Sequence, residues 1–481
     1  MKTGLLAART FSLPDQQVFA RWSGDCNPIH MDALAARRTQ AGACVVHGVH
    51  TVLWALDGLA AAGEPMARLA SLKAQFNKFV YLDREIALTV SRRTVDGLKV
   101  VLTDDGLTVS TLTLKYGPRE QAAFEAFGNS AVTALSDAPL QPAFEEMAAL
   151  SGRLAPPRHA RELADRFAHL CAALGERRLT GLALLSTVVG MACPGLYSMF
   201  SGFSVNMSQD GESESLDWRT ERTDERFRMV WMRVNGFGIA GEVSSWVRAE
   251  PVVLPSIAAL SSLVQPDAFA GRVALIIGGS RGLGAVTAKL LAAGGAQIIV
   301  SYASGRSEAE SLVREIRGLR GDAAADSIAY DVGGDSGVQL AGLTKSITHF
   351  YYFATPRISR QSAAVFDRSH FNELMRFYVD GFYVLSKWLI DNHRTSLRNI
   401  FYPSSVFVTS RPAGMTEYAM AKAAAEILCA DLMKATAGLS IATPRIPRVL
   451  TDQTASVPPV ETADAASVML PLLRAENEPA R

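Results

Sequence analysis

The sequence predicts two fold classes in one chain, an α+β region followed by an α/β region with a doubly wound parallel sheet. Residues 49–62 form a long apolar stretch of helical character, and strand-like runs follow it, which is typical of an antiparallel sheet packed on a helix. From residue 271 short continuous apolar runs alternate with helical segments, which indicates a buried parallel sheet. At 481 residues the chain is also too long for a single core.

In the first region a helix is expected over residues 13–23 and a short one over 32–38. Strands are expected after the apolar helix, at 72–79, 85–92, 98–102 and 108–115. From residue 179 the same order recurs, with an apolar helix at 182–191 and strands at 199–207, 227–234 and 241–248. We interpret this as a repeat of fold rather than of sequence. In the second region strands are expected at 273–277, 297–301, 327–331, 349–354, 399–403 and 439–443.

These patterns divide the chain into five segments. Residues 121–178 lack strand alternation and are expected to be a helical connector, and Pro251 to Pro266 reads as a linker. The predicted segments are therefore a first α+β domain, the connector, a second α+β half, the linker and the α/β domain, at 1–120, 121–178, 179–255, 256–270 and 271–481.

Composition excludes several classes of protein. The formal net charge is +1 with both signs interspersed, so no overall field favours nucleic acid or an anionic membrane. Five cysteines are scattered without CxxC or metal-type spacing, which is typical of thiols in a reducing compartment. The apolar runs are too short for a signal peptide or a membrane span. We expect a cytoplasmic protein with no metal, no nucleic-acid partner and no membrane partner.

A first candidate site lies at residues 25–30, which read Asp-Cys-Asn-Pro-Ile-His. A carboxylate (Asp25) and an imidazole (His30) five residues apart on one loop can flank a single water, and the proline stiffens the turn between them. Which of the two is the acid and which the base stays open. The alternative is that Asp25 caps a turn and His30 lies on the surface. His47 is expected to be structural, and His50 to pack rather than react.

This segment, with Asp32 and the His-Gly pair at 47–48, resembles the MaoC-like (R)-specific enoyl hydratase and dehydratase family over about the first 120 residues. Residues 76–81 are similar to that family's strand after the central helix. The resemblance implies the hot-dog fold, in which a sheet wraps a helix, and identifies 179–253 as the partner half of a double hot-dog without the acid–base pair. It implies catalytic roles for Asp25 and His30. It also implies that the Gly48 N–H, at the helix N-terminus, stabilises the oxyanion of a thioester.

A second candidate site begins at residues 278–284, which read Gly-Gly-Ser-Arg-Gly-Leu-Gly between a strand and a helix. This order places backbone N–H groups at a helix N-terminus, where they can bind a pyrophosphate. The acidic residue that usually binds an adenosine 2′-hydroxyl is missing after the second strand, where 301–306 read Ser-Tyr-Ala-Ser-Gly-Arg. With Arg281 in the turn, this favours a 2′-phosphate and therefore NADP(H).

Tyr418 and Lys422 are four residues apart on one helix face, and Ser405 precedes Tyr418 by thirteen residues. We expect the nearby ammonium to lower the pKa of the phenol. Residues 271 to about 455 thereby resemble the short-chain dehydrogenase/reductase family, which has a Rossmann-type fold. The resemblance implies that the tyrosine donates a proton to the carbonyl, the serine hydrogen-bonds that oxygen and the lysine binds ribose. The expected cofactor contacts are Gly278, Ser280, Arg281, Gly282, Leu283, Gly284, Ser304, Arg306, Asp331, Val332 and Lys422.

Three departures from that family stand out. Its Asn-Ala-Gly turn is replaced by Phe-Ala-Thr-Pro at 353–356, and the asparagine of its proton relay is absent from the Tyr-Val-Asp-Gly segment at 378–381. Its Pro-Gly segment reads Pro-Arg-Ile-Pro-Arg at 444–448. A domain that does not reduce its substrate is therefore an alternative. Residues 451–454 are expected to belong to a lid over the nicotinamide.

Because ketone reduction makes the alcohol that dehydration removes, the two resemblances imply consecutive steps. We expect a bifunctional 3-oxoacyl-thioester reductase and (R)-3-hydroxyacyl-thioester dehydratase or enoyl hydratase. It would act on an acyl-CoA or acyl carrier protein thioester, in fatty-acid, polyketide or related acyl metabolism, and form a homo-oligomer. The alternative is that only the reductase is active and that the hot-dog pair is a non-catalytic acyl-binding scaffold. The carrier, the acyl chain length and the direction of the reaction stay open.

Overall fold

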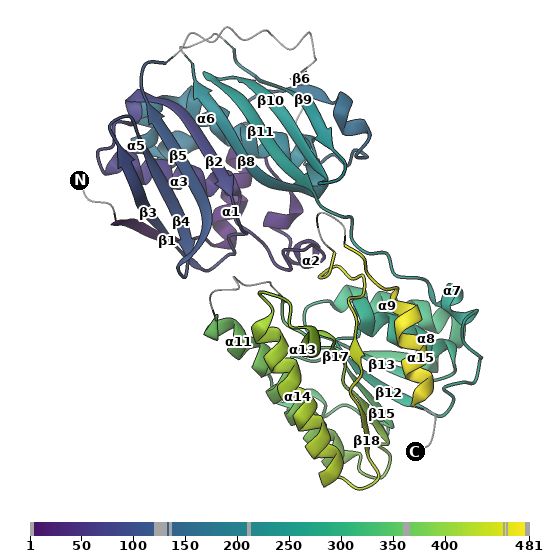
Figure 1. The fold of residues 1–481 in the computed structure, drawn as a ribbon. Coiled ribbons are helices and arrows are strands. Elements are labelled where there is room, and N and C mark those ends of the chain that lie inside the picture. Colours follow the sequence, from purple (N-terminus) through teal and green to yellow (C-terminus); the bar gives the residue numbers. More distant parts are fainter. Residues whose placement is uncertain are drawn as a thin grey trace. The chain divides into compact units, whose positions relative to one another are not determined.

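The computed structural model describes residues 4–119, 132–133, 137–208, 213–358, 366–455, 457 and 460–476. The chain forms two compact units (Figure 1). The first comprises Met1–Pro251 and Ala455–Val460, and the second comprises Val252–Thr454 and Glu461–Arg481. The first unit is α+β and the second is α/β with a parallel sheet, which confirms the predicted fold class.

The first unit contains one sheet of 11 strands in the order β1-β3-β4-β5-β2-β8-β11-β10-β9-β7-β6. The strands of its first half are β1 (Gly4–Thr10), β2 (Leu69–Phe76), β3 (Glu85–Thr94), β4 (Gly97–Asp104) and β5 (Leu107–Tyr116). The others are β6 (Val132–Thr133), β7 (Ser151–Leu154), β8 (Ser198–Met207), β9 (Leu216–Asp224), β10 (Met229–Gly236) and β11 (Ile239–Val247).

The sheet consists of two halves of the same design. At its centre β2 pairs antiparallel with β8, from Ser71 opposite Asn206 to Gln75 opposite Gly202. Outward from β2 come β5, β4, β3 and β1, and outward from β8 come β11, β10, β9 and β7 in matching order. The predicted recurrence of helix followed by sheet is thus present, and one apolar core serves both halves.

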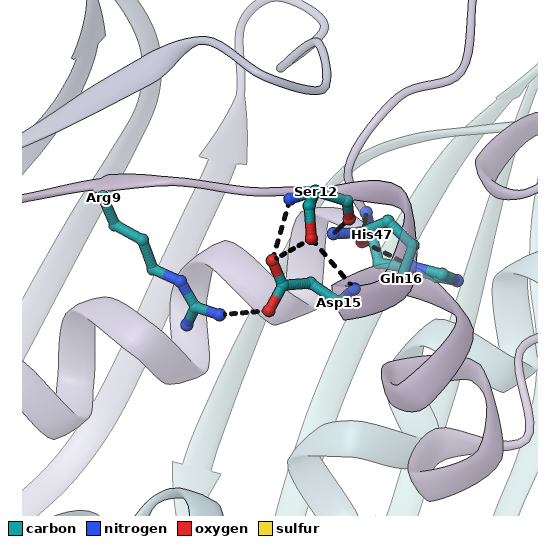
Figure 2. A network of polar contacts seen from close by, with 5 residues as sticks. All are labelled: Arg9, Ser12, Asp15, Gln16 and His47. Carbon is teal, nitrogen blue, oxygen red and sulfur yellow. Dashed lines mark hydrogen bonds and ion pairs between the residues drawn. The ribbon is translucent and has the colours of Figure 1, made fainter.

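Helices cover one face of this sheet (Figure 1). They are α1 (Leu13–Ser23), α3 (Gly48–Ala61), α4 (Glu162–Arg166), α5 (Ala168–Leu174) and α6 (Glu176–Thr187), which continues into a π-helical turn, η4 (Val188–Ala192). The short helix α2 (Ala33–Arg37) packs on the 3-10 turn Pro28–His30. The central helices α3 and α6 contact each other. Helix α1 begins where expected because the hydroxyl of Ser12 accepts from the N–H of Asp15 and the Asp15 carboxylate accepts from the N–H of Ser12, as Figure 2 shows.

Four strands of this sheet were not predicted, namely β1, β6, β7 and β9. Strand β1 is almost fully exposed and β9 carries five charged residues, so neither shows the alternation that marks a half-buried strand. Strand β7, within the expected helical connector, has four residues and pairs with β9, from Ser151 opposite Arg219 to Leu154 opposite Leu216. Four residues are too few to establish a period, and the charged residues of β9 mask the alternation of a longer strand.

The second unit has a six-stranded parallel sheet in the doubly wound order β14-β13-β12-β15-β16-β18. Its strands are β12 (Val273–Ile277), β13 (Gln297–Tyr302), β14 (Ala325–Ala329), β15 (His349–Tyr352), β16 (Asn399–Phe401) and β18 (Ser440–Ala442). Alternate residues of β12 enter two different cores, with Ala274 and Ile276 in one and Leu275 and Ile277 in the other. Burial on both faces explains the continuous apolar runs of the sequence.

Helices line both cores. One core includes residues of α7 (Ile257–Ser261), α8 (Gly282–Ala293), α9 (Arg306–Arg320) and α15 (Ala465–Ala475). The other includes residues of α11 (Arg368–Met375), the π-helical η7 (Arg376–Gly381), α12 (Phe382–Asn392) and α14 (Thr416–Ala435). A short parallel pair, β17 (Ser404–Ser405) and β19 (Arg445–Ile446), lies outside the main sheet. The 444–448 segment therefore runs beside Ser405.

Candidate active sites

The loop that carries Asp25 and His30 starts where α1 ends. Gly24 closes the helix in the left-handed conformation, at φ 81°, which favours glycine. The side chain of Asn27 then accepts from the N–H of Ile29 and starts a single 3-10 turn, Pro28–His30. The local sequence thus folds the six-residue segment into two tight turns that bring its first and last side chains together.

Asp25 is only 2% exposed. Its Oδ2 accepts from the hydroxyl of Ser186 at 2.6 Å, and its Oδ1 accepts from the N–H of Asn27 at 3.1 Å. Burial raises the pKa of Asp25, while His30, the Ser186 hydroxyl and the Asn27 N–H oppose that rise. The turn-capping contact of the alternative interpretation is therefore present, but the carboxylate also lies buried beside an imidazole.

The imidazole of His30 is oriented by the backbone. Its Nδ1 lies 2.8 Å from the carbonyl oxygen of Val45, which can only accept, so Nδ1 carries the hydrogen. In the neutral ring Nε2 then has the free lone pair. Burial lowers the pKa of His30, with Asp25 opposing, so the neutral form is favoured. The ring stacks on His47, with centroids 3.7 Å apart.

Ligand atoms of Asp25, His30 and His47 all lie within 4.8 Å of one another. Two atoms that each bind one water at tetrahedral angles are about 4.6 Å apart, so a separation within 4.8 Å is compatible with one water shared by Asp25 and His30. Such a trio can also bind a metal ion. His47, however, has Nδ1 3.0 Å from Gln16 Oε1 and Nε2 3.1 Å from the Asp25 carbonyl oxygen, so both its ring nitrogens already face protein oxygens.

Helix α3 begins at Gly48, immediately after His47. The N–H of His47 donates to Gln16 of α1, which ties the two helices together (Figure 2). Within the described parts of the chain the N–H of Gly48 has no acceptor, as expected for the first turn of a helix. His50 packs among the rings of Phe11 and Phe19, as expected.

The glycine-rich turn of the second unit is closely packed against its surroundings. A Cβ at Gly284 would lie 2.3 Å from the carbonyl oxygen of Gly278, and one at Gly278 would lie 2.7 Å from the backbone of Phe353. Gly278 and Gly282 have φ of 72° and 55°. Side chains at Gly278 and Gly284 would collide with the neighbouring backbone, so this tight turn requires glycine. Helix α8 begins at Gly282, so N–H groups of its first turn can bind a pyrophosphate.

The other expected cofactor residues lie around this turn or after the next strands. Ser280 and Leu283 are half-buried within it, Ser304 is exposed after β13, and Val332 is half-buried beyond β14. The guanidinium of Arg281 lies 4.0 Å from the carboxylate of Asp452, in the expected lid segment. Arg306 is exposed and pairs with Glu310. The exposed Asp331 accepts from the N–H of Gly333 at 2.9 Å.

The structure brings Ser405, Tyr418 and Lys422 together. A hydrogen bond joins the Tyr418 phenol to Ser405. Burial nevertheless raises the pKa of Tyr418 to about 12. The expected lowering by Lys422 is wrong for this structure, because desolvation of the phenol dominates and the ammonium lies 6.0 Å from the Tyr418 ring centroid.

Lys422 lies among aromatic rings that sequence reasoning missed. Its Nζ is 3.9 Å from the ring centroid of Tyr378 and 4.6 Å from that of Tyr402, and it donates to the Pro403 carbonyl at 2.8 Å. Burial lowers the pKa of Lys422 to about 7. Tyr378, in the segment where the asparagine was missing, also shares a hydrogen bond with the hydroxyl of Thr355. Tyr378 and Tyr402 were visible in the sequence and were the signal that could have indicated an aromatic site for Lys422.

The first unit is a sheet that wraps helices and carries a carboxylate–imidazole pair. The second unit has a doubly wound parallel sheet and carries a tyrosine–lysine pair. Residues 3–110 match the MaoC like domain family, and residues 272–457 match the short chain dehydrogenase family. The chain is therefore a fusion of a MaoC-like domain with a short-chain dehydrogenase domain.

Two relatives match short stretches of the chain. Versicolorin reductase stcU of Emericella nidulans is 40% identical over 82 residues, which are 17% of this chain and 30% of that protein. Short-chain dehydrogenase/reductase GME11373 of Pestalotiopsis microspora is 46% identical over 68 residues, 14% of this chain and 26% of that protein. The chain thus spans less than a third of the length of these relatives.

Solved structures of short-chain dehydrogenases are similar at low identity. One from Pseudomonas syringae has a TM-score of 0.40 at 19% identity, and covers 44% of this chain and 90% of its own. One from Burkholderia cenocepacia J2315, in complex with NADP, has a TM-score of 0.38 at 22% identity, and covers 43% of this chain and 91% of its own. Among the described helices none is long and apolar enough to cross a bilayer.

Proposed function

We propose that this protein reduces 3-oxoacyl thioesters with NADPH and dehydrates the resulting (R)-3-hydroxyacyl thioesters to 2-enoyl thioesters, or catalyses the reverse steps. The observation that carries the proposal is the meeting of Asp25 and His30 within 4.8 Å of each other beside the N-terminus of α3. A non-catalytic acyl-binding scaffold has no need for a buried acid–base pair at that place.

In dehydration one group removes the Cα proton and the other protonates the leaving hydroxyl, so that water departs. The Nδ1–H of His30 donates to Val45, which leaves Nε2 to take the Cα proton. The raised pKa of Asp25 suits it to protonate the hydroxyl. The Gly48 N–H and the α3 dipole stabilise negative charge on the thioester oxygen, and such a donor is worth about 3–4 kcal/mol in the transition state. Hydration reverses each step.

The second domain supplies the reduction. When NADPH is bound, the glycine turn around Gly278 and Gly284 would hold its pyrophosphate and Lys422 its ribose, and Arg281 and Arg306 would donate to its 2′-phosphate. NADPH, when bound, provides the hydride. Tyr418 donates the proton to the carbonyl oxygen, and Ser405 holds that oxygen by a hydrogen bond.

Product analysis tests both halves at once. The protein is incubated with a 3-oxoacyl thioester and NADPH, and the products are identified by mass spectrometry. We expect a 3-hydroxyacyl and a 2-enoyl thioester. A hydroxyacyl product alone would leave only the reductase, and consumption of neither substrate nor NADPH would refute the proposal for both domains.

Tyr378 fills the role of the missing asparagine in this proposal, because its ring holds the Lys422 ammonium. Cation–π contact favours the charged form by about 0.5–2 kcal/mol. Burial already lowers the pKa of Lys422 to about 7, and loss of the ring lowers it further. In Tyr378→Leu the fall of the reduction rate at high pH should therefore begin at lower pH than in the unmodified protein. Tyr378→Phe, which keeps the ring, should retain the original pH profile of kcat.

The remaining partners follow from chemistry and resemblance. The substrate is an acyl thioester of coenzyme A or of an acyl carrier protein. We propose a homo-oligomer, which is supported by large apolar side chains exposed on two helices, namely Tyr383 and Val384 on α12 and Met420 and Ile427 on α14.

A further inference from the structure

The loop that carries Asp25 is held by hydrogen bonds from α6, the central helix of the second half of the first unit. At the end of α6, the hydroxyl of Ser186 donates to Asp25 Oδ2 at 2.6 Å, and the hydroxyl of Thr187 donates to the carbonyl of Ser23. Both residues are buried, at 3% and 0% exposure. Two adjacent hydroxyls at the buried end of α6 thus both point to one segment more than 150 residues earlier in the chain.

The π-helical turn η4, which continues α6, completes this contact. The side-chain amide of Asn27 donates to the carbonyl oxygens of Gly190 and Gly195 at 2.9 and 3.0 Å. A Cβ at Gly190 would lie 2.3 Å from Asp25 Oδ1 and 2.5 Å from Oδ2. Only glycine therefore leaves room for the carboxylate at this position. π-helical turns often occur at functional sites.

These contacts decide how the carboxylate can act. A buried carboxylate without donors would be costly and free to rotate. Ser186 satisfies Oδ2 from one side, and the Asn27 N–H satisfies Oδ1 from within the loop. These two hydrogen bonds fix the direction of the other lone pairs of the Asp25 carboxylate. They also fix the distance from that carboxylate to His30.

We propose that Ser186 is a positioning residue for Asp25 and that Gly190 provides the space for its carboxylate. The helix of the second half, α6 with η4, thereby sets the geometry of the first site. This rests on the proposed dehydratase function. The second half has no acid–base pair of its own, and its contribution is the donor and the gap that set the geometry of the first.

The test is the pH profile of hydration of trans-2-butenoyl-coenzyme A by Ser186→Ala, with Thr187→Val as the matched control. Both variants remove one buried hydroxyl from the same helix end, but only the first removes a donor to Asp25. In Ser186→Ala we expect kcat/KM to fall about tenfold to a hundredfold, because hydrogen bonds to charged groups are among the stronger ones. The limb of the profile that reports Asp25 should move to higher pH, since the charged carboxylate loses a donor.

Thr187→Val should leave the limb that reports Asp25 at its original pH, because this variant removes a contact to the Ser23 carbonyl and no donor to the carboxylate. Gly190→Ala, with its fold checked by circular dichroism, should lose hydration, because the added methyl occupies the place of the carboxylate. Equal profiles for Ser186→Ala and Thr187→Val, with full activity in Gly190→Ala, would overturn the inference. If Asp25→Asn is inactive in the same assay, the proposed function survives that result; if Asp25→Asn is active, the proposed function itself fails.

Discussion

Replacing Asp25 by asparagine or His30 by alanine is expected to abolish hydration of a short enoyl thioester while NADPH-dependent reduction persists. The first change removes the titrating carboxylate and leaves an amide of the same shape, and the second removes the imidazole whose Nδ1 the Val45 carbonyl holds. Loss of a general acid or base typically costs about 10²–10⁴-fold in rate. The measurement is the absorbance change of trans-2-butenoyl-coenzyme A on hydration, alongside NADPH oxidation with a 3-oxoacyl thioester.

Asp32→Asn is the matched control for the carboxylate. Asp32 follows the same loop, but it is exposed and its carboxylate accepts from the N–H groups of Leu34 and Ala35 at the start of α2. Asparagine also caps helices, so this variant should hydrate at the normal rate. Unchanged hydration in both Asp25→Asn and His30→Ala would refute the assignment of the site.

Tyr418→Phe is expected to stop reduction and leave the affinity for NADPH nearly intact. The substitution removes only the phenol hydroxyl that bonds Ser405 and keeps the ring packed against Tyr378 and Phe407. We expect kcat to fall about 10²–10⁴-fold, the range for a lost general acid. Fluorescence titration measures NADPH binding, and stopped-flow absorbance measures the reduction.

Tyr402→Phe is the control for this second prediction. Tyr402 also faces Lys422, but its buried hydroxyl has no hydrogen-bond partner in the part of the chain that the structure describes. Removing that hydroxyl leaves no group unsatisfied, so reduction should continue at close to the normal rate. Full activity in Tyr418→Phe would remove Tyr418 from the mechanism.

The sequence was most informative where one residue type has one structural use. Alternation located β3 and β5, and the Ser-x-x-Asp capping box and Gly24 bounded α1 at the residues expected. Strands β1 and β9 escaped because exposed or charged residues mask their alternation, and β7 escaped because four residues are too few to establish a period. Local pattern thus predicts strands with a long, half-buried alternation and misses those that are short, exposed or rich in charge.

The residues of the candidate sites also differ in how far the sequence could predict them. The spacing of Asp25 and His30 on one loop, and of Tyr418 and Lys422 on one helix, was readable because each pair is local. Ser186 was not, because its partner is 161 residues away and only the folded sheet joins them. The predicted direction of the Tyr418 pKa shift was wrong because burial of the phenol depends on how the whole domain packs. The spacing of Tyr418 and Lys422 in the sequence carries no information about that burial.

The antiparallel pairing of β2 with β8 has a practical consequence for anyone dividing this protein. A fragment that stops before β8 would bare the backbone of β2 from Ser71 to Gln75, an open row of amide donors and carbonyl acceptors in the middle of an apolar surface. Such rows recruit strands from other molecules. Truncation before β8 should therefore yield aggregates or strand-swapped dimers instead of a minimal catalyst. A fragment of the first unit has to end beyond β11.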